Sequence, residues 1–127
     1  MKILILGQSG GLASFRDGMN AKHVMNWFKA KSFEEFQTFA KLMTVREKHE
    51  DKSVSLPHMS DISTALREAD IVFLIGRYAQ SLIEAYHRHC FKPLWREEKY
   101  VGLPHPASKV LSNNEIQEYI DEVLKCL

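Results

Sequence analysis

The chain has few of the features that mark secreted, membrane or metal-bound proteins. Only two cysteines, Cys90 and Cys126, occur in 127 residues, and their spacing fits no metal or redox motif. The longest apolar runs, "ILIL" and "IVFLI", are far too short to cross a bilayer. Nothing near Met1 resembles a secretory signal, because a short apolar run leads directly into glycines. We therefore expect reduced cysteines and an intracellular protein, in the cytoplasm or nucleoid, with no membrane partner.

The chain also lacks an excess of charge of either sign. Its 17 basic and 16 acidic residues leave a formal net charge of +1, so no global field attracts nucleic acid or membrane. Any surface that binds DNA must then be local. Two basic runs are candidates, but both contain acidic residues, which is typical of a solvated face. Their basic residues are Lys41, Arg46, Lys48 and Lys52 in the first run, and Arg88, Lys92, Arg96 and Lys99 in the second.

The apolar residues, 45% of the chain, predict a single α/β domain that spans residues 1–127. Three short apolar runs bounded by turn residues indicate buried strands at 3–6, 71–75 and 100–103. Strands that alternate with helices favour a parallel sheet covered on both faces. We expect a three-layer α/β/α sandwich with a mostly parallel sheet of about four strands.

Five segments carry apolar residues at helical spacing. The last is the clearest, because Ser112 and Glu115 form a capping box before an apolar stripe that runs to Leu127. Ser32 and Glu35 form a second capping-box pattern, but the segment after it runs into "KLMTV", which fits a helix or a short strand. The other three helical segments are 21–29, 62–69 and 79–86.

Polar and glycine-rich segments follow the three predicted strands. The carboxyl ends of parallel strands meet at one edge of a sheet, where ligands bind in open α/β folds. The three segments are "GQSGG", "GRYAQ" and "LPHPAS", and we expect them to converge at this edge. Together they would form one polar site at this edge, with Gln8, Ser9, several glycine amides, Arg77, His105 and Ser108.

The stretch "GQSGG" also fits the nucleophile elbow of a serine hydrolase. In that interpretation Ser9, Asp70 and His105 form a triad in the chain order of α/β-hydrolases. However, the segment after Ser9 is loop-like rather than helical, and the elbow of that fold follows several strands. A serine esterase is therefore the weaker alternative.

The stretch "LPHPAS", a strand end with His-Pro before a loop and a C-terminal helix, resembles the second motif of the uracil-DNA glycosylase superfamily. Three further stretches resemble other motifs of that family, in the family's order: "ILILGQSGG", "LMTVREKHEDKSVS" and "ADIVFLIGRYAQSLIE". The resemblance implies a protein that binds DNA or a nucleotide and holds a flipped or modified pyrimidine base at the strand ends. Active members hydrolyse the N-glycosidic bond with water. We expect no metal and no cofactor.

The resemblance also implies roles for individual residues. His105 matches the motif histidine, which hydrogen-bonds a pyrimidine carbonyl oxygen and stabilises the departing base. Gln8 and the amides of Ser9 and Gly10 face the base or sugar. Asp17 is the nearest carboxylate that can assist water. The remaining matches are Phe15, which stacks on the base, Ala107 and Ser108, near the phosphate, and Val110 or Leu111, the wedge that fills the vacated stack.

Three positions depart from the family's pattern. Ser9 stands where many active members carry an acid, Ala40 where the uracil-reading strand carries Asn, and Ala107 where Ser follows His-Pro. These departures leave open a different modified base, a weak glycosylase, or a nucleic-acid or nucleotide-binding module without catalysis. From the residues alone, His105 also fits a structural turn, and Asp17 is most simply part of a turn.

Overall fold

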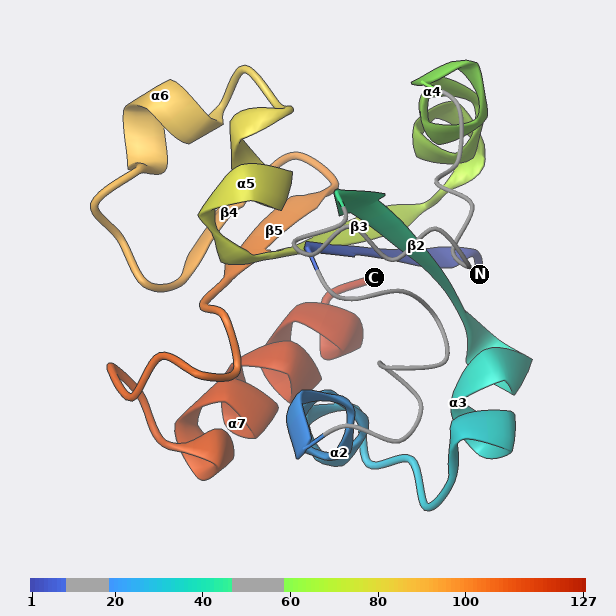
Figure 1. Cartoon of the computed structure of the whole chain (residues 1–127), viewed down its shortest axis with the longest axis vertical. Coiled ribbons are helices and arrows are strands. Elements are labelled where there is room, and N and C mark those ends of the chain that lie inside the picture. The colour runs from blue at the N-terminus through green and yellow to red at the C-terminus, as the bar shows by residue number, and fades with distance from the viewer. Residues whose placement is uncertain (9–18, 47–58) are drawn as a thin grey trace.

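A five-stranded sheet forms the centre of the molecule, and helices cover both of its faces (Figure 1). The computed structural model describes residues 1–8, 19–46 and 59–127. The strands are β1 (Ile3–Gln8), β2 (Ala40–Arg46), β3 (Ile71–Ile75), β4 (Trp95–Glu97) and β5 (Tyr100–Leu103). The helices are α2 (Met19–Trp27), α3 (Phe33–Phe39), α4 (Met59–Glu68), α5 (Gly76–Ser81), α6 (Tyr86–His89) and α7 (Asn113–Lys125).

The strands follow the order β2-β1-β3-β5-β4. β1 pairs in parallel with β2 and β3, and β3 pairs in parallel with β5, so four strands end at the same edge. The prediction of a mostly parallel α/β sheet is confirmed, and the strands at 71–75 and 100–103 have their predicted bounds. The sheet has five described strands rather than about four. The additional strand is β4, which pairs antiparallel with β5 and is too short to form an apolar run.

Alternate residues of the central strands face opposite layers of helices, as the pleat of a strand requires. Ile5 and Phe73 belong to one core with α2, α3 and α7. Leu4 and Leu74 belong to a second core with α4 and α5. Figure 1 shows α2, α3 and α7 below the sheet and α4, α5 and α6 above it. All five residues of β3 are buried, which explains its continuous apolar sequence.

Both serines predicted to cap helices do so, and the reciprocal capping box forms at α7, whereas at α3 the Glu35 carboxylate accepts the Lys31 N–H instead. At α7, the Ser112 hydroxyl accepts the Glu115 N–H at 3.2 Å, and the Glu115 carboxylate accepts the Ser112 N–H at 3.3 Å. At α3, the Ser32 hydroxyl accepts the Glu35 N–H at 3.1 Å. This helix ends at Phe39 and the chain continues directly into β2, so "KLMTV" belongs to a strand.

The prediction of one helix over 79–86 is wrong. The chain forms α5, then turns, and then forms α6. The N–H groups of Leu82, Ile83 and Tyr86 each bond to the carbonyl three residues earlier, at 3.3, 3.0 and 3.0 Å. These tight turns interrupt the regular helix, because an α-helix needs bonds to the fourth preceding carbonyl. None of the helices in the described ranges is long and apolar enough to cross a membrane.

Candidate functional site

A cleft of about 310 Å³ opens at the carboxyl ends of β3 and β5, and is called the carboxyl-edge cleft below. Three segments form its walls: the start of α5, the residues that follow α6, and the loop after β5. Its volume lies at the lower end of the range for small-molecule sites. The polar side chains that carry its chemistry are Arg77, Gln80, Lys92, His105 and Ser108.

The loop after β5 fixes the imidazole ring of His105. The Ala107 N–H donates to His105 Nδ1 at 3.0 Å, and the Ser108 N–H donates to the His105 carbonyl at 2.9 Å. Because Nδ1 accepts a hydrogen bond, it carries no proton, and a neutral imidazole then holds its proton on Nε2. His105 is half-buried and lines the cleft.

Gly76 brings the start of α5 close to His105. Its φ of +84° is in the left-handed region, which a glycine adopts without strain. This conformation lets the helix begin directly after β3. A Cβ at this position would lie 3.7 Å from both Cβ and Cδ2 of His105, so the two residues are direct neighbours.

Gln80 joins α5 to three strands through a buried amide. Its Nε2 donates to the Leu103 carbonyl on β5 at 2.8 Å and lies 3.4 Å from the Leu74 carbonyl on β3. Its Oε1 accepts the Trp95 Nε1–H from β4 at 2.9 Å. A buried amide with satisfied bonds is held in one position. The sequence prediction missed Gln80, although a glutamine between Ala79 and the apolar pair Leu82-Ile83 was an available signal.

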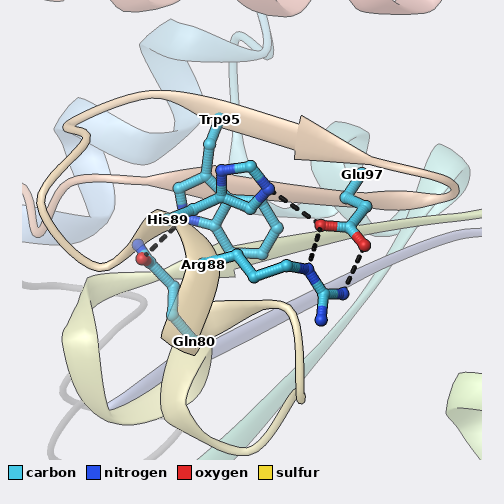
Figure 2. Close-up of polar contacts among 5 residues, drawn as sticks. All are labelled: Gln80, Arg88, His89, Trp95 and Glu97. Carbon is cyan, nitrogen blue, oxygen red and sulfur yellow. Dashed lines mark hydrogen bonds and ion pairs between the residues drawn. The ribbon is translucent and has the colours of Figure 1, made fainter.

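A second network extends from Trp95 toward solvent (Figure 2). The His89 ring from α6 stacks on Trp95, with ring centroids 5.1 Å apart and planes 13° apart. His89 Nε2 lies 2.8 Å from the Glu97 carboxylate, and the Arg88 guanidinium donates to both oxygens of that carboxylate. The hydrogen bond from Arg88, followed by that from His89, lowers the pKa of Glu97 below its ordinary value. These contacts attach α6 to β4.

The charged groups at the carboxyl-edge cleft are positive. Arg77 and Lys92 line it, and no described residue of its lining is an Asp or Glu. Neither cation forms an ion pair with another described residue. This distribution favours an anionic ligand. It also divides the second basic run, because Arg88 binds Glu97 whereas Lys92 lies at the cleft.

The structure brings several of the predicted site residues together at this edge. His105 and Ser108 line the cleft with Arg77, as expected from the strand ends. Ala107 is exposed and contributes its N–H to the His105 ring. Gln8 ends β1, and its backbone pairs with β2 after a register shift. Four predicted site residues lie outside the described residues: Ser9, Gly10, Phe15 and Asp17.

The two candidate wedge residues differ in their environments. Val110 lines the cleft and is 66% exposed. Leu111 is partly buried against the core that contains α2 and α7. Of the two, Val110 is therefore the residue that can contact a ligand.

The proposed hydrolase triad is wrong. Asp70 precedes β3 at the amino edge, where its carboxylate accepts the Lys2 N–H at 2.7 Å. Five strand residues separate Asp70 from the carboxyl edge, a span of roughly 16 Å, so it cannot orient His105. Ala40, which the resemblance places at the base-reading position, also begins its strand at the amino edge.

A second cavity, of about 370 Å³, lies at this amino edge and is called the amino-edge cavity below. It is formed by the first residues of β1 and β2 and by the ends of α3 and α4. Its charged residues are of both signs: Lys2, Lys41 and Glu68. The amino-edge cavity is thus the larger of the two, but its charge is mixed, whereas the charged residues of the carboxyl-edge cleft are all positive.

Neither a metal centre among the described residues nor a match to a known protein indicates a chemistry for this chain. Within residues 1–8, 19–46 and 59–127, no group of three His, Cys, Asp or Glu side chains is placed to hold a metal ion. Comparisons with protein-family models, with curated proteins and with solved structures give no match for the chain. The carboxyl-edge cleft and the sequence motifs are therefore the features that indicate a function.

Proposed function

We propose that the protein is uracil-DNA-glycosylase-like and binds a flipped or modified pyrimidine base of DNA in the carboxyl-edge cleft. The observation that carries this proposal is the imidazole of His105, whose Nδ1 accepts the Ala107 N–H. The ring proton is then on Nε2, and we assign to this N–H the hydrogen bond to the base. The carbonyl oxygens of a pyrimidine can accept such a hydrogen bond. The resemblance of "LPHPAS" to a glycosylase motif supports the same role for His105, that of a donor to the base.

The positive charge of the cleft supports a nucleotide rather than a free base. Arg77 and Lys92 provide two cations within reach of a ligand in the cleft, and Ser108 provides a hydroxyl. Phosphates account for much of the affinity of proteins for DNA, and Arg, Lys and Ser side chains are common partners. In this proposal His105 selects the base and the cations hold the backbone.

The same histidine supports hydrolysis of the N-glycosidic bond as a further activity. The bond would break with its electron pair moving to the base nitrogen. A hydrogen bond from His105 to the base carbonyl stabilises that negative charge. Water adds to the sugar carbon, and its proton is transferred to the base. The described lining contains no carboxylate to activate that water, so base binding is the primary proposal and hydrolysis the secondary one.

Binding can be tested by fluorescence anisotropy with a labelled single-stranded oligonucleotide that contains one deoxyuridine. We expect His105→Ala to weaken binding by about tenfold or more, because losing one partner of a buried hydrogen bond costs on the order of 1–3 kcal/mol. His87→Ala is the matched control, since His87 is exposed on α6 and is not in the cleft lining. Equal affinity of the folded His105→Ala protein and the unchanged protein would contradict the proposal.

Base release is tested on the same oligonucleotide by alkaline cleavage of the strand at abasic sites. Release that is lost in His105→Ala and retained in His87→Ala supports a glycosylase. Failure to release uracil, mismatched thymine or modified pyrimidines from bound DNA overturns hydrolysis and leaves a base-binding module.

A further inference from the structure

Residues 90–93, "CFKP", connect α6 to the segment before β4 and form one wall of the carboxyl-edge cleft; they are called the strap below. Within the strap, Phe91 is 95% exposed, the highest exposure of any large apolar side chain in the described ranges. Single exposed apolar residues are common and need no explanation by themselves. Phe91, however, lies beside a cationic cleft, and this position suggests that its ring contacts a ligand there.

The strap is held in a defined position although Phe91 projects into solvent. The Lys92 N–H donates to the His89 carbonyl at 2.9 Å, and Pro93 restricts the backbone that follows. The side chain of His89 is itself fixed between Trp95 and Glu97 (Figure 2). The Phe91 ring is therefore presented from an ordered turn, which reduces the entropy lost when a ligand binds it.

The surroundings of Phe91 match the chemistry of single-stranded nucleic acid. Lys92 is its neighbour in the chain, and Arg77 lies in the same cleft lining. Val110, which is also mostly exposed, contributes a second apolar side chain to that lining. Proteins that bind single strands combine a positive groove with aromatic rings on which bases stack. An exposure of 95% leaves the ring faces of Phe91 open to such a base.

We propose that Phe91 is a stacking platform for the nucleobase adjacent to the one held in the cleft, and that the substrate is single-stranded or locally unpaired DNA. This inference rests on the proposed function, because it places the neighbouring nucleotide relative to a base beside His105. In a duplex the neighbouring base is already stacked and paired. Only an unpaired neighbour can move onto Phe91 without breaking those contacts.

The test compares two labelled single-stranded oligonucleotides by fluorescence anisotropy. Both contain one deoxyuridine; in one its neighbours are thymidines, and in the other they are abasic sugars. We expect Phe91→Ala to weaken binding of the thymidine-flanked strand about tenfold and to leave the abasic-flanked strand nearly unchanged. Phe91→Trp retains binding because it keeps an aromatic face, whereas Phe91→Leu, which keeps an apolar side chain, behaves like Phe91→Ala.

Each result bears on the inference. If the unchanged protein binds and His105→Ala weakens binding, but Phe91→Ala has no effect or affects both strands equally, stacking is overturned and the proposed function stands. Equal affinity of the unchanged protein for the thymidine-flanked strand and its duplex overturns the single-strand preference. If the unchanged protein binds neither strand, the proposed function and this inference both fail. Thermal unfolding checks that the variants fold, which we expect because the Phe91 ring is outside the core.

Discussion

The two edges of the sheet differ in the charges and the polar side chains of their cavities. At the amino edge, the larger cavity is formed by strand starts and helix ends, and its charges are of both signs. At the carboxyl edge, the smaller cleft contains an imidazole oriented by a backbone N–H and an amide bonded to three strands. Cavity volume alone would choose the amino edge. The fixed polar groups favour the carboxyl edge, because binding sites need preorganised donors and acceptors.

The largest expected effect concerns two glycines of the sheet. A Cβ on Gly102 would lie 2.0 Å from Trp95 Nε1, so Gly102→Ala must displace the indole and break its bond to Gln80. We expect a loss of unfolding free energy on the order of 3 kcal/mol. At Gly7 on β1, no described atom lies within 4 Å of the added Cβ, so Gly7→Ala should change stability by less than about 0.5 kcal/mol. Urea denaturation measures both, and equal effects would show that Trp95 does not depend on Gly102.

The next effect compares a glutamine at each edge. Gln80→Leu leaves the Leu103 carbonyl and the Trp95 N–H without their partner, which should cost about 2 kcal/mol. Gln37 is exposed at the amino-edge cavity, so Gln37→Leu should have an effect within about 0.5 kcal/mol. Thermal and urea unfolding compare the two variants. A small loss for Gln80→Leu would mean that the amide does not hold the cleft.

Removing one cation at each edge compares the two cavities by their effect on DNA binding rather than on stability. Arg77→Ala should weaken binding of the deoxyuridine oligonucleotide and reduce the dependence of log affinity on log salt by about 0.7, the value for one phosphate contact on a single strand. Lys41→Ala, at the amino-edge cavity, should leave both quantities unchanged. Anisotropy titrations over a range of salt concentrations provide the measurement. The opposite result would move the binding site to the amino edge.

The smallest effect concerns the contacts of Glu97 with Arg88 and His89, and it depends on pH. The pKa of Glu97 is lowered in the folded protein, so its stabilising contribution is present above the ordinary carboxyl value of 4.5 and is lost as pH falls through the folded value. We therefore expect Glu97→Gln to be less stable than the unchanged protein at neutral pH, with the difference vanishing in acid. Urea midpoints measured across this range test it, with Glu98→Gln in the adjacent turn as control. A difference that persists in acid would rule out the charge as its cause.

The sequence predicted the parts of the fold that depend on local pattern. β3 was recognisable because a strand covered on both faces is apolar throughout, and α7 because Ser112 and Glu115 cap it. β4 was missed because "WRE" has no apolar run. The helix over 79–86 was wrong because tight turns replace regular bonds there, and composition does not reveal that.

The candidate site was only partly predictable for a related reason. His105 and Arg77 were found because they follow strands, and parallel strands end at one edge. Gln80 and the strap were missed because their role depends on partners that are distant in sequence. Trp95 and Leu103 reach Gln80 only because β5 lies beside β3 and β4 lies beside β5 in the sheet. The local sequence pattern does not indicate the order of the strands in the sheet.

The three-residue strand β4 has a consequence for local opening of the structure. Among the described strands it lies at the edge of the sheet and pairs with β5 alone, yet Trp95 and Glu97 on it hold α6 and thus the strap. If β4 separates from β5, α6 and the cleft wall lose their attachment while the strands β1 and β3 keep theirs. The unit from α6 to β4 should therefore exchange its amide hydrogens sooner than β3. A ligand that touches the strap should slow this exchange, so hydrogen exchange can detect occupancy of the cleft before the ligand is identified.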